Sequence, residues 1–180
     1  MITPEQAQVM MSEIKQTQDR SREFTGYWRA GVYIQLWGFI WFICYLGNYL
    51  RPELSGWIWL VGDSCGVLGS ILIGKLQSSS KREGEGKFYL ALSVVVIFGV
   101  LVSNLIKAPE AIGLFWNCLF MTIYMLVGVW EGKRWFLLGA SVFVLSVLSY
   151  WVLFPWFNLA MAILGGGGLM LGGTLMRCAA

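Results

Sequence analysis

The residue best suited to chemistry in this chain is Asp63, a carboxyl group inside an apolar stretch. That stretch, from Trp57 to Lys75, reads WIWLVGDSCGVLGSILIGK and is long enough to cross a bilayer as a helix. Asp63 lies about 9 Å along the helix from Trp57. A charged acid at bilayer depth costs about 2.5–3.5 kcal/mol, so it must be paired, hydrated or protonated. Asp63 is therefore either a proton or cation site, or a structural hydrogen-bonding group.

Other polar residues accompany Asp63 toward the same side of the membrane. Arg51 and Lys107 are the basic residues expected there, and both are candidate ion partners. The asparagines near the ends of the apolar segments either line a small polar vestibule or simply satisfy helix ends, and we prefer the second explanation. The candidate ion or polar site comprises Asp63, Asn104, Asn117 and Asn48, with Asn158 close by.

The residue types needed for catalysis are missing. The chain contains no His, which excludes a His-based metal site or catalytic base. The acids Glu53, Glu110 and Glu131 fall at the ends of apolar segments, and no serine or cysteine has a His to activate it. We therefore expect no catalytic residue, no metal and no cofactor, and we expect that the protein is not an enzyme.

A stripe of small residues predicts where the helix that carries Asp63 packs. The stripe consists of residues four positions apart, namely Gly62, Gly66, Ser70 and Gly74, and such a stripe lets another backbone approach closely. At about 100° per residue, Asp63 falls within the arc of this stripe. We therefore expect Asp63 to face protein rather than lipid.

A second set of glycines lies near the C-terminus. The run from Gly165 to Gly168 lacks the GK[ST] signature of a phosphate-binding loop. Gly168 and Gly172 form a GxxxG pattern, which favours close helix packing, with a hinge as the alternative. The two glycine sets together predict that the second and sixth apolar segments form a tight pair.

The first apolar segment carries one amide and a row of aromatic rings. Gln35 is expected to form a hydrogen bond to another helix. The row is spaced at i, i+4 and i+8, which favours packing over a ligand cage, and it consists of Trp37, Trp41 and Tyr45.

Composition indicates an integral membrane protein. Of the 180 residues, 57% are hydrophobic and only 13% are charged, against about 25% charged in soluble domains. The apolar residues occur in blocks of roughly twenty, the length that spans a bilayer. We predict an all-α bundle of six transmembrane helices, preceded by a cytoplasmic amphipathic helix. The spans are expected at about 31–50, 56–76, 88–106, 111–130, 135–154 and 156–176, with consecutive helices packed as antiparallel neighbours.

Basic residues predict the orientation of this bundle. Of the 13 Lys and Arg residues, only Arg51 and Lys107 fall on one side of the predicted membrane. The remainder cluster before span one, between spans two and three, between spans four and five, and after span six. This asymmetry places both termini in the cytoplasm.

The N-terminal residues predict a helix from 3 to 25. Thr3, Pro4 and Gln6 form a capping box with proline at the first helical position, and Gly26 is expected to end the helix. One side is apolar, with Ala7, Met10, Met11, Ile14, Ser21 and Phe24. We divide the chain into residues 1–28, an amphipathic helix, and residues 29–177, the transmembrane domain. The helix either lies on the inner membrane surface or the bundle, or docks on a partner protein.

The order of these features resembles small bacterial inner-membrane proteins with six spans that are uncharacterised. The likeness rests on the charged N-terminal helix, the stretch WGFIWFICYLG, and a last span ending in GGGGLMLGG and a basic residue. It implies a bacterial inner membrane and brings no functional residue.

Two functions fit these patterns. The first is a non-enzymatic accessory or regulatory membrane protein that acts through its cytoplasmic face. The alternative is a small transporter or channel for protons, cations or a small solute that uses Asp63. The expected partners are the lipid bilayer, a cytoplasmic or membrane protein, or a second copy of the chain, and no nucleic acid.

Overall fold

The structure, a computed structural model, describes residues 4–77 and 85–178 of the chain. Every regular element in these two ranges is helical and none is a strand, which confirms the all-α prediction. The long elements are α1 (Pro4–Leu50), α2 (Ser55–Gln77), α3 (Glu85–Ser103), α4 (Pro109–Glu131), α5 (Lys133–Val152) and α7 (Gly167–Cys178). Shorter elements are η1 (Pro52–Leu54), η2 (Phe154–Trp156), α6 (Phe157–Ala160) and the π-helical segment η3 (Met161–Gly166).

Five stretches of the described chain are long and apolar enough to cross a membrane. They are Thr25–Leu50, Pro52–Gln77, Glu110–Glu131, Lys133–Val152 and Phe154–Cys178. The stretch expected as span three is shorter, because the apolar part of α3 is Leu90–Ser103, about 21 Å long. After Ser103 the chain forms a turn, in which the backbone amide of Leu105 donates to the carbonyl of Val102.

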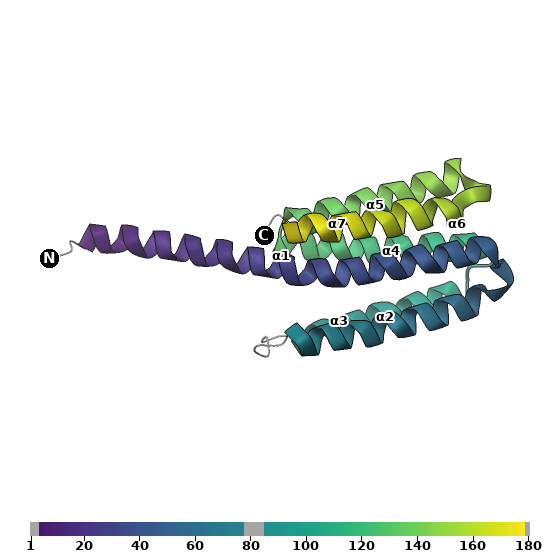
Figure 1. The fold of residues 1–180 in the computed structure, drawn as a ribbon, viewed down its shortest axis with the longest axis horizontal. Helices are drawn as coiled ribbons and strands as arrows, with labels where there is room; N and C mark the ends of the chain where they lie inside the picture. Colours follow the sequence, from purple (N-terminus) through teal and green to yellow (C-terminus); the bar gives the residue numbers. More distant parts are fainter. Residues whose placement is uncertain (1–3, 78–84, 179–180) are drawn as a thin grey trace.

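The prediction that a helix ends at Gly26 is wrong, because α1 continues without a break from Pro4 to Leu50. Its 47 residues make a rod about 70 Å long. The N-terminal part projects beyond the bundle along the same axis (Figure 1), so it turns neither sideways nor back onto the other helices. A glycine inside a helix costs only about 1 kcal/mol, and no proline follows to enforce an end.

Four helical segments surround the buried core and contribute its side chains. They are α1, α4, α5 and the continuous run of α6, η3 and α7. Core side chains come from all four, for example Tyr45 of α1, Met121 of α4, Val142 of α5 and Met161 of η3. α2 packs on α1, and α3 rests on α4. In the described ranges α2 and α3 hardly touch, although they are consecutive, so the expectation of antiparallel neighbours fails for this pair.

One close contact between helices joins α1 to the C-terminal run of η3 and α7. Gly31 and Gly38 of α1 face Gly173 and Gly166 in antiparallel order. A Cβ atom on Gly38 would lie 2.9 Å from the carbonyl oxygen of Gly166, and one on Gly173 would lie 2.7 Å from that of Gly31. Glycine on both helices therefore permits a backbone approach that no other residue allows.

The predicted tight pair between spans two and six is wrong. The small-residue stripe of α2 lies instead against α1, where Gly62 faces Cys44 and Gly66 faces the ring of Trp37. The indole N–H of Trp37 donates to the hydroxyl of Ser70 over 3.2 Å. A stripe of small residues indicates that a helix approaches, but several helices compete for it, and α1 is the nearest in sequence.

Candidate functional site

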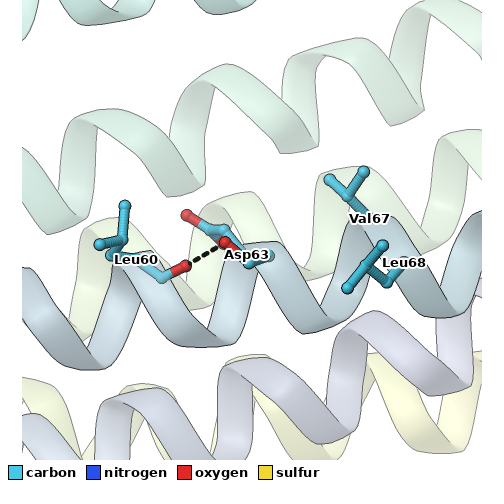
Figure 2. Close-up of a pocket in the computed structure, with 5 residues that line it drawn as sticks. Leu60, Asp63, Val67 and Leu68 are labelled. Carbon is cyan, nitrogen blue, oxygen red and sulfur yellow. Dashed lines mark hydrogen bonds between the residues drawn. The ribbon is translucent and has the colours of Figure 1, made fainter.

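Asp63 lies on an exposed flank of α2, beside the stripe that α1 covers. No other helix in the described residues covers it, so the prediction that it faces protein fails within this chain. A shallow open groove runs beside it, and all of the residues that line this groove belong to α2: Leu60, Asp63, Ser64, Val67 and Leu68 (Figure 2). The dashed line in Figure 2 marks the bond of 2.7 Å that the Ser64 hydroxyl donates to the carbonyl oxygen of Leu60. Asp63 does lie beside the small-residue stripe of α2, but α1 covers only the centre of that stripe.

Asp63 forms no ion pair with any residue that the structure describes. In the part of the chain that the structure describes, its carboxylate has neither a hydrogen-bond donor nor a cation beside it. Arg51, an expected partner, instead approaches Glu53 at 3.4 Å, and both side chains are largely exposed. Lys107 is also exposed, beyond the end of α3. Within the described residues, the carboxylate of Asp63 is therefore not paired with a basic group.

The asparagines are not gathered around Asp63. Asn117 is buried in α4 and Asn48 is buried near the end of α1. Asn104 is exposed, and its amide donates to the carbonyl oxygen of Val100 over 2.7 Å, as expected of an asparagine that satisfies a helix end. Asn158 is half-buried in α6. Two of these asparagines are thus buried, one is half-buried and one is exposed, and none of them lines the groove beside Asp63.

The polar contact that sequence reasoning missed is between Tyr45 and Asn117. The phenol of Tyr45 donates to the Oδ1 atom of Asn117 over 2.8 Å, and both residues are only 1% exposed. The Nδ2 atom of Asn117 is buried and has no acceptor among the described residues. The one indication in the sequence was their similar predicted depth in the membrane. Tyr45 lies late in the first predicted span and Asn117 lies early in the fourth, so both fall toward the same membrane side.

Tyr45 also holds several helices together through its ring. Trp59 of α2 lies edge-on to it with centroids 4.9 Å apart, and Phe157 of α6 lies edge-on at 6.3 Å. Such edge-to-face pairs stabilise a fold by more than the burial of their surface area alone provides. The aromatic row of span one therefore packs inside the bundle, as the sequence favoured, and Tyr45 is its most connected member.

A second polar cluster fastens α1 where it leaves the bundle. The Nε2 atom of Gln35 donates to Thr174 over 2.8 Å, and Arg177 donates to the Oε1 atom of Gln35 over 2.9 Å. The predicted bond from Gln35 to another helix is thus confirmed. The guanidinium of Arg177 also lies 5.6 Å from the ring centroid of Trp28. We call these four residues the α1 clamp.

Beside the clamp, Arg134 of α5 covers the ring of Tyr27 at 5.0 Å. Tyr27 is 2% exposed, although it lies only one residue after Gly26. Helices α5 and α7 thus each place an arginine on an aromatic ring of α1, in a geometry that favours a cation over a π-face. The projecting part of α1 begins immediately before this point.

The C-terminal glycines divide between two neighbours. Gly166 meets the backbone of Phe42 in α1, whereas Gly172 meets the side chain of Leu138 in α5. Gly168 has more room, since a Cβ there would lie 3.7 Å from Val142. The residues of the predicted GxxxG, Gly168 and Gly172, therefore face α5, and the closest backbone contacts belong to Gly166 and Gly173.

Metal-binding groups do not assemble in the described residues, where no three His, Cys, Asp or Glu side chains lie together. The fold and these sites define an all-helical protein with five helices able to cross a membrane. Comparison with protein-family models, with curated proteins and with solved structures finds no match to this chain. The resemblance to six-span bacterial proteins stays a prediction.

Proposed function

We propose that this protein is a non-enzymatic accessory or regulatory component of a bacterial inner membrane, with six spans and both termini in the cytoplasm. Its N-terminal helix binds a partner, and the bundle receives the effect of that binding. The observation that carries this proposal is the continuity of α1, which runs unbroken from the projecting part into the buried core.

The projecting part offers an apolar surface that the bundle does not use. Val9, Met10, Met11 and Ile14 are all more than half exposed. Methionine side chains are flexible and adapt to differently shaped partner surfaces. Glu13 and Lys15 accompany them. An apolar helix face with charged neighbours suits the groove of a helix-binding partner.

The α1 clamp supports coupling between this surface and the bundle. Gln35 and Trp28 bind Arg177 at the end of α7, and Tyr27 binds Arg134 at the start of α5. A rigid helix fixed at its exit cannot swing freely, so a partner that tilts the projecting part also tilts the core part of α1. A tilt transmitted in this way is the kind of change by which a regulatory partner could act on the bundle.

The proposed topology draws support from the positions of the helix ends. The C-terminal end of α7 lies at the end of the bundle from which α1 projects (Figure 1). Lys75 and Arg177 occupy the last turns of α2 and α7, and Lys133 begins α5. Basic residues mark the cytoplasmic side. α3 runs the length of the bundle between the end of α2 and the start of α4 (Figure 1), which favours a sixth crossing.

Transport, the alternative function, has less support. A proton or cation path needs polar groups that line one route, and Asp63 lies on the exposed flank of α2 while Asn117 is buried against Tyr45. Asp63→Asn protein in liposomes tests the alternative, since a transporter of this kind would lose pH-dependent flux.

The experiment that tests the proposal compares three forms of the tagged full chain, purified from native membranes in mild detergent. They are the wild type, the Gly26→Pro variant and the matched Gly26→Ala variant. A Cβ on Gly26 meets nothing within 4 Å outside the helix's own backbone, so alanine fits there without a clash. Proline removes a helical hydrogen bond and its ring clashes with the preceding turn, which breaks the helix at a cost of about 3 kcal/mol or more. A fourth form carries Met10→Glu and Ile14→Glu in the apolar surface.

We expect a stoichiometric companion protein with the wild type and with Gly26→Ala. The double glutamate variant should lose the companion, because charges replace its apolar contacts. Gly26→Pro should keep the companion while uncoupling it from the bundle, detected as loss of the partner-dependent change in proteolytic protection of the loops. A companion retained by the double glutamate variant would reject the proposed binding surface.

A further inference from the structure

The exposed flank of α2 contains a charge that its surroundings do not balance. Leu60, Val67 and Leu68 are each more than half exposed on this flank, as suits a surface against lipid. Asp63 lies among them and makes no hydrogen bond or ion pair within the described residues. A carboxylate among lipid tails is costly unless a cation or a donor reaches it.

The apolar segments of the chain contain no basic residue that could pair with Asp63. Neither Lys nor Arg occurs within 30–50, 57–74, 88–106, 111–132 or 135–176. At the Trp57 end of the bundle, Arg51 already pairs with Glu53, and Lys107 lies beyond the end of α3. Rearranging these helices against one another therefore cannot bring a basic group to the depth of Asp63.

A second copy of the chain does not solve the problem either. Its apolar segments bring the same residues, so a symmetric contact through α2 sets Asp63 against Asp63, and like charges repel. The small-residue stripe, the usual contact surface for pairing helices, is already covered by α1 through Gly62 and Gly66. The compensating group must come from a different molecule.

We infer that the exposed flank of α2 around Asp63 docks a transmembrane helix of another protein that carries a Lys or Arg at matching depth. The open groove beside Asp63 accepts the methylene stem of that side chain against Leu60 and Val67, and the carboxylate accepts its N–H groups. Charge complementarity selects the occupant, because opposite charges brought together in a low dielectric attract strongly.

This surface is separate from the proposed cytoplasmic contact. It uses α2 (Ser55–Gln77), whereas the proposed function uses residues 9–14 in the projecting part of α1. The inference therefore stands or falls independently of the N-terminal helix.

The test uses a synthetic single-span helix as the probe. Its host sequence is apolar, with one Lys placed about two turns from one end, and it is reconstituted with the full chain in phosphatidylcholine vesicles, whose lipids carry no net charge to compete. A donor dye on Cys178, which is exposed at the end of α7, reports binding by energy transfer after the other three cysteines are replaced by alanine. Two control probes carry Gln in place of Lys, or the Lys near the opposite end.

We expect the Lys probe to bind the wild type at least about tenfold more tightly than either control probe. Asp63→Asn should abolish that preference without altering the fold, since its side chain is exposed and of equal size. Asp63→Lys should reverse it, so that a probe with Glu at the same depth binds best. If Asp63→Lys does not insert, the Asp63→Asn comparison decides alone.

Two results would overturn the inference. One is equal binding of the Lys and Gln probes to the wild type, which would mean that Asp63 is protonated and faces lipid. The other is Asp63-dependent energy transfer between two populations of the labelled protein with no probe present, which would make a second copy the occupant.

Discussion

Arg177 in the last turn of α7 donates a hydrogen bond of 2.9 Å to Gln35 of α1, across 142 residues of sequence. The same amide of Gln35 donates to Thr174 over 2.8 Å, so both of its polar atoms are bound to α7. These hydrogen bonds join the last helix of the chain to the first. It lies at the point where α1 leaves the bundle, and it therefore sets the direction of the projecting part.

Gln35→Ala should destabilise the bundle by about 1 kcal/mol, because it removes two hydrogen bonds between helices and membrane hydrogen bonds are of modest strength. The measurement is thermal unfolding in detergent, followed by tryptophan fluorescence. Gln8→Ala is the matched control, since Gln8 is exposed on the projecting part. Equal stability of the two variants would show that the α1 clamp contributes nothing to folding.

Gly166→Ala and Gly167→Ala should differ sharply although they are neighbours. A Cβ on Gly166 would lie 2.6 Å from the backbone nitrogen of Phe42, whereas one on Gly167 meets nothing within 4 Å. We expect Gly166→Ala to cost about 1–3 kcal/mol by forcing α1 and η3 apart. Gly167→Ala should be neutral or stabilising by up to about 1 kcal/mol. Chemical denaturation of both variants in detergent tests this, and an equal response would contradict the close approach.

The apolar segments could be located from sequence because bilayer thickness and helix rise fix their length. The sequence did not show which of these segments pack against one another. The glycines of α2 predicted a close neighbour, but a stripe of small residues does not say which helix fills it, and α1 does so. The sequence predicted that the first helix ends at Gly26, whereas α1 continues through it. A glycine ends a helix only when the residues after it stabilise a turn in the chain.

The direction of Asp63 was missed for a related reason. A helical wheel gives the angle between Asp63 and Gly66, but not how wide an arc the neighbouring helix covers. Since α1 contacts only the centre of the stripe, Asp63 at its edge stays exposed. The bond from Tyr45 to Asn117 was equally out of reach, because two residues 72 positions apart meet only through the packing of whole helices.

Tyr45→Phe should destabilise the protein by about 1–3 kcal/mol, because it leaves Asn117 buried with neither of its polar atoms paired. The double variant Tyr45→Phe with Asn117→Leu should recover part of this loss, since both polar partners are then apolar. A double-mutant cycle on unfolding free energies measures the coupling. Additive losses in the cycle would mean that the 2.8 Å contact carries no energy.

Asp63→Asn should leave the melting temperature of the isolated protein in detergent within about 2 °C of wild type. The reason is that the Asp63 side chain is exposed and makes no hydrogen bond or ion pair within the described residues, so the fold loses nothing when its charge is removed. Asn117→Leu provides the contrast, because it breaks a buried bond and should lower the melting temperature by several degrees. A loss of more than about 5 °C in Asp63→Asn would place this acid inside the fold and not on its surface, and would remove the basis for docking a basic helix there.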